Sequence, residues 1–366
     1  MKSKKPASFY LSFFLLFCVS VSVYLLKTLT VSYTTGSDTS SSQSSAIEVV
    51  AGNDADYIKW VDFNITCEAL SAAYNLDVES YDTPVHLNWI ELLAYAGAKS
   101  GGTFDKKSVS LIQKLADELT CGETTMDDLT TDMKYYDYYL EAYEAVLGGM
   151  VGEYETEQPC EDGSKVWKKV YGLKAFSPIA KGFPYSDYDD FGSSRSYGYK
   201  RRHLGHDMMG QIGTPIVAIE SGYVEALGWN QYGGWRIGIR SFDKKRYYYY
   251  AHLRQNFPYA LNLEEGSIVT AGDVIGYMGH TGYSTVENTN NIDTVHLHLG
   301  LQLIFDESQK EGNNEIWIDC YELTKFLYKN RSETQKNTET KEWLRVYEMK
   351  DPVVLQNLTD KQTPSE

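Results

Sequence analysis

The stretch Val295-His-Leu-His-Leu-Gly-Leu-Gln-Leu303 alternates apolar residues with polar or small ones along its whole length. Successive side chains of a β-strand point to opposite faces, so this period of two predicts a strand whose leucines face a core. His296 and His298 then lie together on the other face. An ordinary polar strand face also produces a His-x-His pair, so the pair indicates a function only together with further residues.

Short apolar segments separated by glycines surround this stretch from Gly213 onward. Many short strands with turn signals between them are typical of a largely antiparallel β domain. Strands are expected at 216–219, 223–227, 235–241, 247–253, 268–269, 274–278 and 295–305.

Residues 56–155 show helical spacing instead. Apolar residues recur every three or four positions in a segment opened by Thr83-Pro84 and ended by Gly101-Gly102, and again over 109–119 and 135–151. The predicted fold class is α+β, with an N-terminal membrane-anchoring helix, a small helical domain and a mainly antiparallel β domain. The expected boundaries are a helical domain at 56–155, a linker at 156–195, the β domain at 196–325 and a polar tail at 326–366.

The N-terminal region predicts membrane attachment. Residues 7–26 contain no charge, and a helix of that length spans a hydrocarbon core of about 30 Å. Three lysines precede this run and one follows it, which places the preceding residues in the cytoplasm. We therefore expect a cytoplasmic stub and an uncleaved signal anchor at 1–28, a Ser/Thr-rich tether at 29–55, and a single-pass protein of the cell membrane whose β domain is extracytoplasmic.

Cysteine content leaves two interpretations open in that compartment. Disulfides are permitted outside the cytoplasm, and four cysteines allow three pairings; four isolated buried thiols are equally compatible with the sequence. The residues concerned are Cys67, Cys121, Cys160 and Cys320.

Charge and composition exclude one class of partner. The formal net charge is −16, whereas a nucleic-acid-binding protein needs a basic face for phosphates. Charged residues make up 23% of the chain and apolar residues 42%, which is typical of a globular protein. We expect no nucleic-acid partner, and the sequence identifies no protein partner.

Six of the seven histidines lie between positions 203 and 298. Within His203-Leu-Gly-His-Asp207, Gly205 allows a tight turn that brings the first and last side chains together. With one histidine of the 296/298 pair they supply the three protein ligands of a catalytic zinc site, which keeps one position for water. His252 ends a tyrosine-rich strand and by alternation shares a face with Tyr248 and Tyr250. His206 and His280 are expected to lie outside the ligand set.

Taken together, these segments resemble the lysostaphin/LytM-type zinc metallopeptidases, which cut peptides of the bacterial cell wall. The resemblance covers roughly residues 197–305. The family's His-x-Gly-x-Asp appears as His203 to Asp207, its Tyr-Ala-His-Leu as Tyr250 to Leu253, its glycine-punctuated segment as Gly279-His-Thr-Gly-Tyr-Ser284, and its closing pair as His296-Leu-His298. The chain departs from the family pattern over 285–295, where it is longer, and at Leu299-Gly300, where the family often has Phe-Glu.

The resemblance implies a role for each of five residues. His203, Asp207 and His298 are the implied ligands of one Zn²⁺ per chain, and His252 and His296 are the implied catalytic pair. The implied function is that of a membrane-anchored zinc metallo-endopeptidase whose substrate is a cross-link or stem peptide of bacterial peptidoglycan. Two alternatives stay open: a non-hydrolysing cell-wall-binding scaffold or activator built on the same domain, and a zinc hydrolase of another amide or ester.

Overall fold

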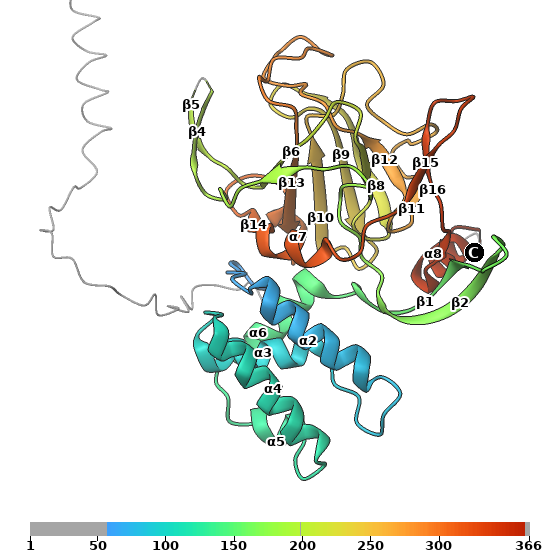
Figure 1. The fold of residues 1–366 in the computed structure, drawn as a ribbon. Coiled ribbons are helices and arrows are strands. Elements are labelled where there is room, and N and C mark those ends of the chain that lie inside the picture. Colours follow the sequence, from blue (N-terminus) through green and yellow to red (C-terminus); the bar gives the residue numbers. More distant parts are fainter. Residues whose placement is uncertain (1–56, 198, 363–366) are drawn as a thin grey trace, which may run out of the picture. The chain divides into compact units, whose positions relative to one another are not determined.

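The structure is a computed structural model that describes residues 57–197 and 199–362. The predicted anchor at 1–28 and tether at 29–55 lie outside these residues. In the part of the chain that is described, no helix is both long enough and apolar enough to cross a membrane. The described residues belong to a single unit, in which a group of helices at 67–147 precedes the strands and two further helices follow most of them (Figure 1).

Helices fill the first part of this unit, as predicted. The Asn88 side chain accepts hydrogen bonds from the backbone N–H groups of Ile90 and Glu91, so α3 begins at Trp89 rather than at Thr83-Pro84 as expected. Gly101 has a φ of 64° and ends α3, which confirms the predicted stop. The helices are α2 (Cys67–Ser80), α3 (Trp89–Ser100), α4 (Lys106–Thr120), α5 (Met126–Thr130) and α6 (Tyr136–Leu147).

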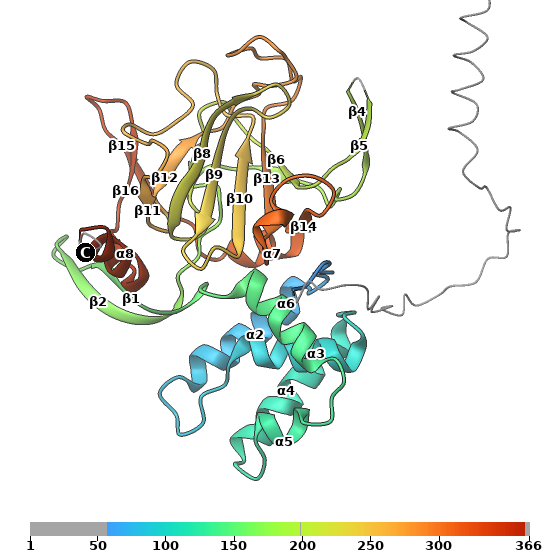
Figure 2. The same ribbon diagram turned by 180° about the vertical axis from the view of Figure 1, so that it is seen from behind.

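An antiparallel sheet forms the second part and confirms the predicted β domain (Figure 2). Its strand order is β11-β8-β9-β10-β13-β6-β3, and β14 also pairs with β13. The strands are β3 (Ser186–Asp187), β6 (His206–Met209), β8 (Gly222–Asn230), β9 (Gly234–Ser241), β10 (Arg246–Ala251), β11 (Ile268–Val269), β13 (His296–Leu303) and β14 (Ile316–Ile318); β7 (Pro215–Val217) pairs separately with β12 (Val274–Tyr277).

β13 lies within this sheet, between β10 and β6. Its leucines at 297, 299, 301 and 303 are at most 1% exposed, so they face the core as the alternation predicted. His296 and His298 therefore project from the opposite face of the same strand. The sheet core thus fixes the direction in which both imidazoles point.

The segment 156–195 and the tail at 326–366 contain more structure than expected. β1 (Val151–Pro159) and β2 (Lys165–Leu173) form a long hairpin, and β17 (Met349–Lys350) pairs with β1. Most of β2 is exposed, so its sequence has no apolar period that would have revealed a strand. The remaining elements are the hairpin β4 (Ser194–Tyr197) and β5 (Tyr199–Arg202), η1 (Glu307–Gln309), α7 (Tyr321–Leu327), β15 (Thr334–Lys336), β16 (Trp343–Arg345) and α8 (Pro352–Gln362).

All four cysteines in the described residues are free thiols. Cys320 is buried, Cys121 is exposed, and Cys67 and Cys160 are half-buried. The alternative of four buried thiols therefore holds for Cys320 only. Burial raises the pKa of the Cys320 thiol, which keeps this sulfur protonated and unreactive.

Arg246 of β10 joins the helices to the sheet. Its guanidinium is 1% exposed and donates to the backbone oxygen of Ala145, at the end of α6, over 2.9 Å. Glu220 accepts from the same guanidinium at 2.7 and 2.9 Å, and the Tyr248 hydroxyl donates to Glu220 at 2.7 Å. A buried cation is stable only when its charge and donors are satisfied, and here both conditions are met.

Replacing Arg246 with methionine is expected to lower the free energy of unfolding by about 3–5 kcal/mol, because Glu220 is left buried without its counter-charge. Urea unfolding measures this difference. Lys169→Met is the matched control: Lys169 pairs with Glu153 on the surface, with side chains 66% and 42% exposed, so the change should stay below about 1 kcal/mol. Equal stabilities of the two variants would contradict the assigned role of Arg246.

Candidate metal centre

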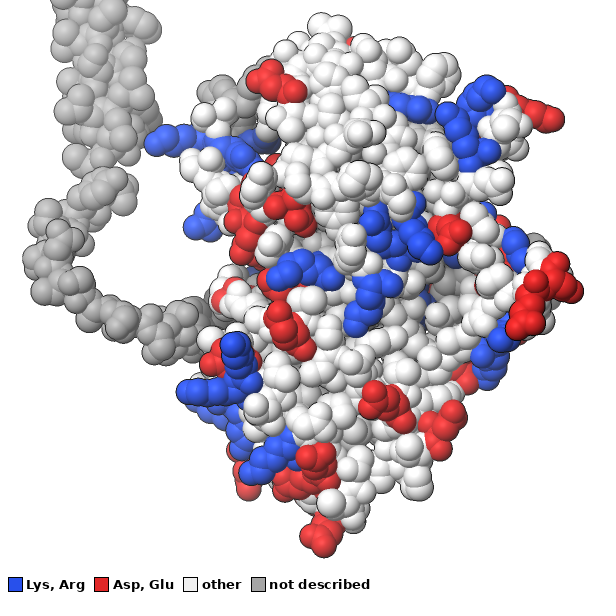
Figure 3. Space-filling view, viewed as in Figure 1, with Lys and Arg blue, Asp and Glu red and all other residues white. Residues whose placement is uncertain are grey.

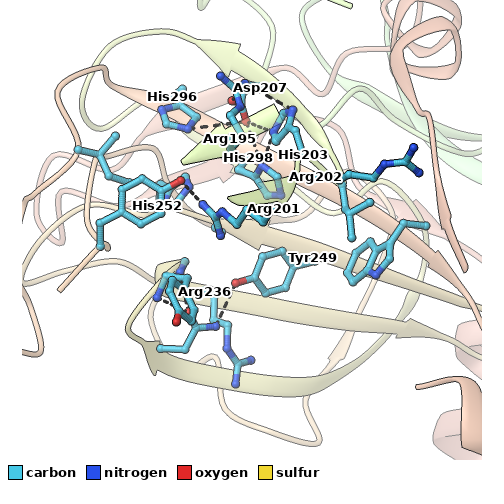
Figure 4. Close-up of a pocket in the computed structure, with 18 of the residues that line it drawn as sticks. Arg195, Arg201, Arg202, His203, Asp207, Arg236, Tyr249, His252, His296 and His298 are labelled. Carbon is cyan, nitrogen blue, oxygen red and sulfur yellow. Dashed lines mark hydrogen bonds and ion pairs between the residues drawn. The ribbon is translucent and has the colours of Figure 1, made fainter. Parts of the chain in front are cut away.

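His203, Asp207 and His298 come together from two distant parts of the chain (Figure 4). Asp207 of β6 and His298 of β13 are directly paired in the antiparallel register, and His203 follows β5. Asp207 Oδ1 lies 3.0 Å from His203 Nε2 and 2.9 Å from His298 Nδ1, and the two ring nitrogens are 3.0 Å apart. Two imidazole nitrogens and a carboxylate oxygen thus converge on one point.

Gly205 makes this convergence possible, for a reason more specific than the expected tight turn. A Cβ at this position would lie 2.6 Å from Cε1 and Nε2 of His298 and 2.7 Å from the backbone oxygen of Leu299. The His298 ring therefore occupies the space that any other residue at 205 would fill.

Two residues that the sequence analysis missed hold the ligand candidates in place. His203 Nδ1, the ring nitrogen that faces away from the cluster, donates to the backbone oxygen of Asp190 over 3.4 Å, and Asp190 Oδ1 lies 3.1 Å from the same nitrogen. Arg195 of β4 donates to Asp207 Oδ2 over 3.1 Å and also pairs with Asp190. Outer partners of this kind fix the orientation of ligating side chains. Neither residue belongs to a recognisable motif, because both lie in the segment expected to be an irregular linker.

Charge within the cluster favours a cation. Burial raises the pKa of Asp207, but hydrogen bonds with His203 and His298 outweigh burial and hold it well below its usual value. Burial lowers the pKa of His298, and the charge of Asp207 offsets only part of this. A carboxylate that stays ionised beside a ring that resists protonation is the donor set that zinc prefers. The residues present therefore fit the zinc ion that the sequence implies.

His252 and His296 face the same cluster. Their ring centroids are 4.7 Å apart, and the His252 ring lies 5.8 Å from that of His298. The expectation that His252 shares a face with Tyr248 and Tyr250 is wrong: both tyrosines point into the core, at most 1% exposed. His252 has a φ of 61°, which breaks the strand alternation just after β10 and turns its ring toward the opposite face.

Backbone carbonyls fix the tautomer of this histidine pair. His252 Nδ1 donates to the Thr281 oxygen over 2.9 Å, and His296 Nδ1 donates to the Thr294 oxygen over 2.8 Å. Each Nε2 is therefore left as the nitrogen that can accept a proton. Burial, followed by the nearby charges of His296 and His298, keeps the pKa of His252 well below its ordinary value.

The two remaining histidines of the domain lie outside the cluster, as expected. His206 is buried with its Nε2 3.1 Å from Asp187, and its ring packs edge-on against Tyr321. His280 Nδ1 donates to the backbone oxygen of Ile292 over 2.7 Å. Within the described residues, the one group of side chains arranged to hold a metal ion contains His203, Asp207 and His298.

The cluster opens into a pocket of about 1470 Å³ along the sheet face. All five predicted site residues line it, together with Asp190 and Arg195. The pocket continues over the outward-facing side chains of β9, β10 and β13. A peptide can therefore lie on the sheet and reach the cluster from this pocket.

Gly205→Ala is expected to weaken zinc binding by about 10- to 100-fold, because the added methyl group displaces the His298 ring. Zinc affinity measured by competition with a chromophoric chelator tests this. In the control Gly152→Ala, the nearest atom to the new methyl group is 3.7 Å away, so affinity should not change. Equal zinc affinity in the two variants would show that the close approach of residue 205 to the ring has no effect on the ligands.

Comparison with known proteins places this part of the chain in a family. Residues 201–313 match Peptidase family M23. The L-Ala–D-Glu endopeptidase of Bacillus subtilis (strain 168) is 38% identical over 130 residues, which is 36% of this chain and 38% of that protein. Lysostaphin of Staphylococcus staphylolyticus is 42% identical over 84 residues, 23% of this chain and 16% of that protein. The chain thus spans well under half the length of either relative.

A solved structure was also found. It is assigned as a glycyl-glycine endopeptidase, LytM, from Ruminococcus gnavus ATCC 29149, and it is 26% identical to this chain. The alignment covers 75% of this chain and 92% of that one, with a TM-score of 0.47. The family match includes all five predicted site residues. Residues 201–313 therefore form a Peptidase M23 domain, and this part of the chain belongs to the lysostaphin/LytM-type peptidases.

Proposed function

We propose that the chain is a zinc metallo-endopeptidase that cleaves stem peptides or cross-links of bacterial peptidoglycan, with His203, Asp207 and His298 as the metal ligands. The observation that carries this proposal is the convergence of these three side chains beside two imidazoles whose Nδ1 atoms are held by backbone carbonyls. Membership of the domain in Peptidase family M23 supports it.

Zinc in a site with three protein ligands supplies a water of lowered pKa and polarises the carbonyl that is attacked. The chain's own residues do the remaining work. One of His252 and His296 accepts a proton from the attacking water at Nε2, and the other, protonated on both ring nitrogens, donates at Nε2 to the oxygen on which negative charge develops. Asp190 and Arg195 hold His203 and Asp207 in position, and the sheet keeps the pair of imidazoles over the cluster.

Mass spectrometry of fragments released from purified peptidoglycan by the full-length chain tests the proposal. New peptide ends are expected, and their sequence identifies the bond that is cut. Binding to cell-wall sacculi without new ends would contradict hydrolysis and favour the non-hydrolysing scaffold or activator. Hydrolysis of other amides or esters with peptidoglycan left intact would favour the more general zinc hydrolase.

We further propose that residues 7–26 anchor the chain in the cell membrane, with the peptidase domain on the extracytoplasmic side. The uncharged run and the lysines before it support this topology. The proposed substrate lies in the same compartment. Protease added to intact spheroplasts should digest the peptidase domain; digestion only after lysis would contradict the topology.

A further inference from the structure

The pocket has an aromatic floor that extends away from the histidines. On β10 the side chains of Tyr247 and Tyr249 face the pocket, and their hydroxyls lie over Gly238 and Gly233, where a Cβ would be 2.0 and 2.1 Å away. The Trp317 ring covers Gly300 in the same way, at 2.6 Å. Because glycine leaves the backbone uncovered, these rings lie directly against the strands and form a surface on which a peptide can rest.

Two arginines stand over this floor. Arg201 of β5 contacts the hydroxyl of Tyr283, and its guanidinium lies 5.0 Å from the Tyr283 ring centroid and 5.6 Å from that of Tyr232. Tyr283 in turn packs against His252, with ring centroids 6.0 Å apart. Arg201 is thus held by aromatic rings next to the histidine pair.

Arg236 of β9 is the second arginine over the aromatic floor of the pocket. Burial raises the pKa of Tyr249, and the charges of Arg236 and Arg201 both act in the opposite direction, so both guanidinium groups lie near this ring. In the view of Figure 4, Arg201 lies between the histidines and Tyr249, and Arg236 lies beyond Tyr249. The two guanidinium groups therefore lie one after the other along the pocket, with Arg201 nearer to the histidines.

Neither arginine has a carboxylate partner among the described residues; of the other arginines that line the pocket, Arg202 also has none, whereas Arg195 pairs with Asp190 and Asp207. Arg240 pairs with Glu225 and Glu307, and Arg246 pairs with Glu220. On the face drawn in Figure 3, acidic and basic side chains are interspersed. Arg202 is exposed to solvent, whereas Arg201 and Arg236 are half-buried. In a chain with a net charge of −16, two half-buried pocket arginines without a counter-charge need an explanation.

The acids that line the same pocket do not supply that counter-charge. Glu225 is held by Arg240 and Lys310, and Glu315 accepts from the indole N–H of Trp317. Asp293 and Glu311 are exposed. A guanidinium in a partly desolvated pocket binds a carboxylate in a bidentate, charge-assisted geometry, and the pocket walls strengthen that attraction.

We propose that Arg201 and Arg236 bind a carboxylate of the substrate, so that the pocket selects an acidic peptide over an uncharged one. This inference rests on the proposed peptidase function and narrows its substrate class. A peptide that contains D-Glu has a free carboxylate close to its backbone, whereas an interior Gly–Gly segment has none. The stem peptide is therefore the better substrate, and the glycine bridge the poorer one.

Paired peptides test the proposal by binding rather than turnover. The probes are L-Ala-D-Glu-L-Lys-D-Ala and the same peptide with D-Gln in place of D-Glu, both amidated at the C-terminus so that only the first contains a carboxylate. They are titrated calorimetrically into zinc-loaded full-length chain that carries His252→Asn to suppress cleavage. The acidic peptide is expected to bind about 10- to 100-fold more tightly, the range for a hydrogen bond to a charged group. Equal affinity for the two peptides would overturn the proposal before any arginine is changed.

Substitution then locates the effect. Arg236→Gln and Arg201→Gln should each remove most of the preference by weakening the acidic peptide while leaving the D-Gln peptide within about threefold of its original affinity. Lys169→Gln removes one exposed surface cation outside the pocket and should keep the preference in full. A preference that survives both arginine changes would overturn the assignment. Absence of wall digestion by the unaltered chain would contradict the proposed function alone, since the binding comparison is independent of turnover.

Discussion

Replacing His298 with alanine is expected to reduce bound zinc from about one ion per chain toward zero and to abolish the release of peptides from cell walls. His298 supplies one of three converging ligand atoms, and a two-ligand site no longer holds zinc against competing water. Zinc content by atomic absorption and fragment release by mass spectrometry measure the two effects. They should fall together, because the metal and the chemistry share one site.

His206→Gln is the matched control for this loss. His206 adjoins Asp207 on β6, but its ring is turned away from the cluster toward Asp187, and glutamine keeps a donor for that carboxylate. Zinc content and activity should therefore stay near those of the unaltered chain. Full wall hydrolysis by zinc-free His298→Ala would contradict the proposed metal centre.

His252→Asn is expected to lower kcat by about 10²- to 10⁴-fold while zinc content is retained, since the ring is proposed to move a proton and is not one of the ligand candidates. Asparagine is the suitable replacement because residue 252 has a φ of 61°, a conformation that asparagine tolerates better than alanine. Steady-state digestion of solubilised peptidoglycan, with zinc measured on the same sample, separates the two effects.

His280→Asn serves as the control for His252, because its ring is bonded to the Ile292 carbonyl outside the cluster. It should retain most of the activity. Loss of zinc in His252→Asn would contradict the division between ligands and catalytic pair, as would unchanged kcat.

Much of the site could be predicted from local sequence. The alternation around His296 and His298 determines which face of β13 they occupy, because the leucines between them must be buried. The turn at Gly205 likewise brings His203 toward Asp207. These predictions succeeded because each depends on neighbours only a few residues away.

The position of the His252 ring could not be obtained in this way. Strand alternation placed it with Tyr248 and Tyr250, but a positive φ at a single residue reverses its direction. Asp190, Arg195 and the pocket arginines were missed for a different reason. Their roles arise from contacts between segments, such as Arg195 with Asp207, which no period within one segment reveals.

The long hairpin of β1 and β2 was missed because a strand exposed on both faces has no apolar face to mark it. Its stability comes from backbone pairing along its whole length and from β17, which arrives from far along the chain. The apolar period of a sequence indicates which residues are buried. It therefore reveals a paired strand only where one face of that strand is buried.

The contact between Arg246 and the end of α6 matters when the chain is shortened to the β domain alone. A shortened chain that starts after α6 would expose the face of α7 on which Phe326 meets Tyr74 and Trp89, and it would leave the Arg246 guanidinium without the Ala145 acceptor. We expect such a fragment to aggregate through the exposed aromatic face and to be less stable at the start of β10, the strand that leads to His252. The helices therefore support the strand that leads to the candidate site, and the smallest stably folded form of the protein includes them.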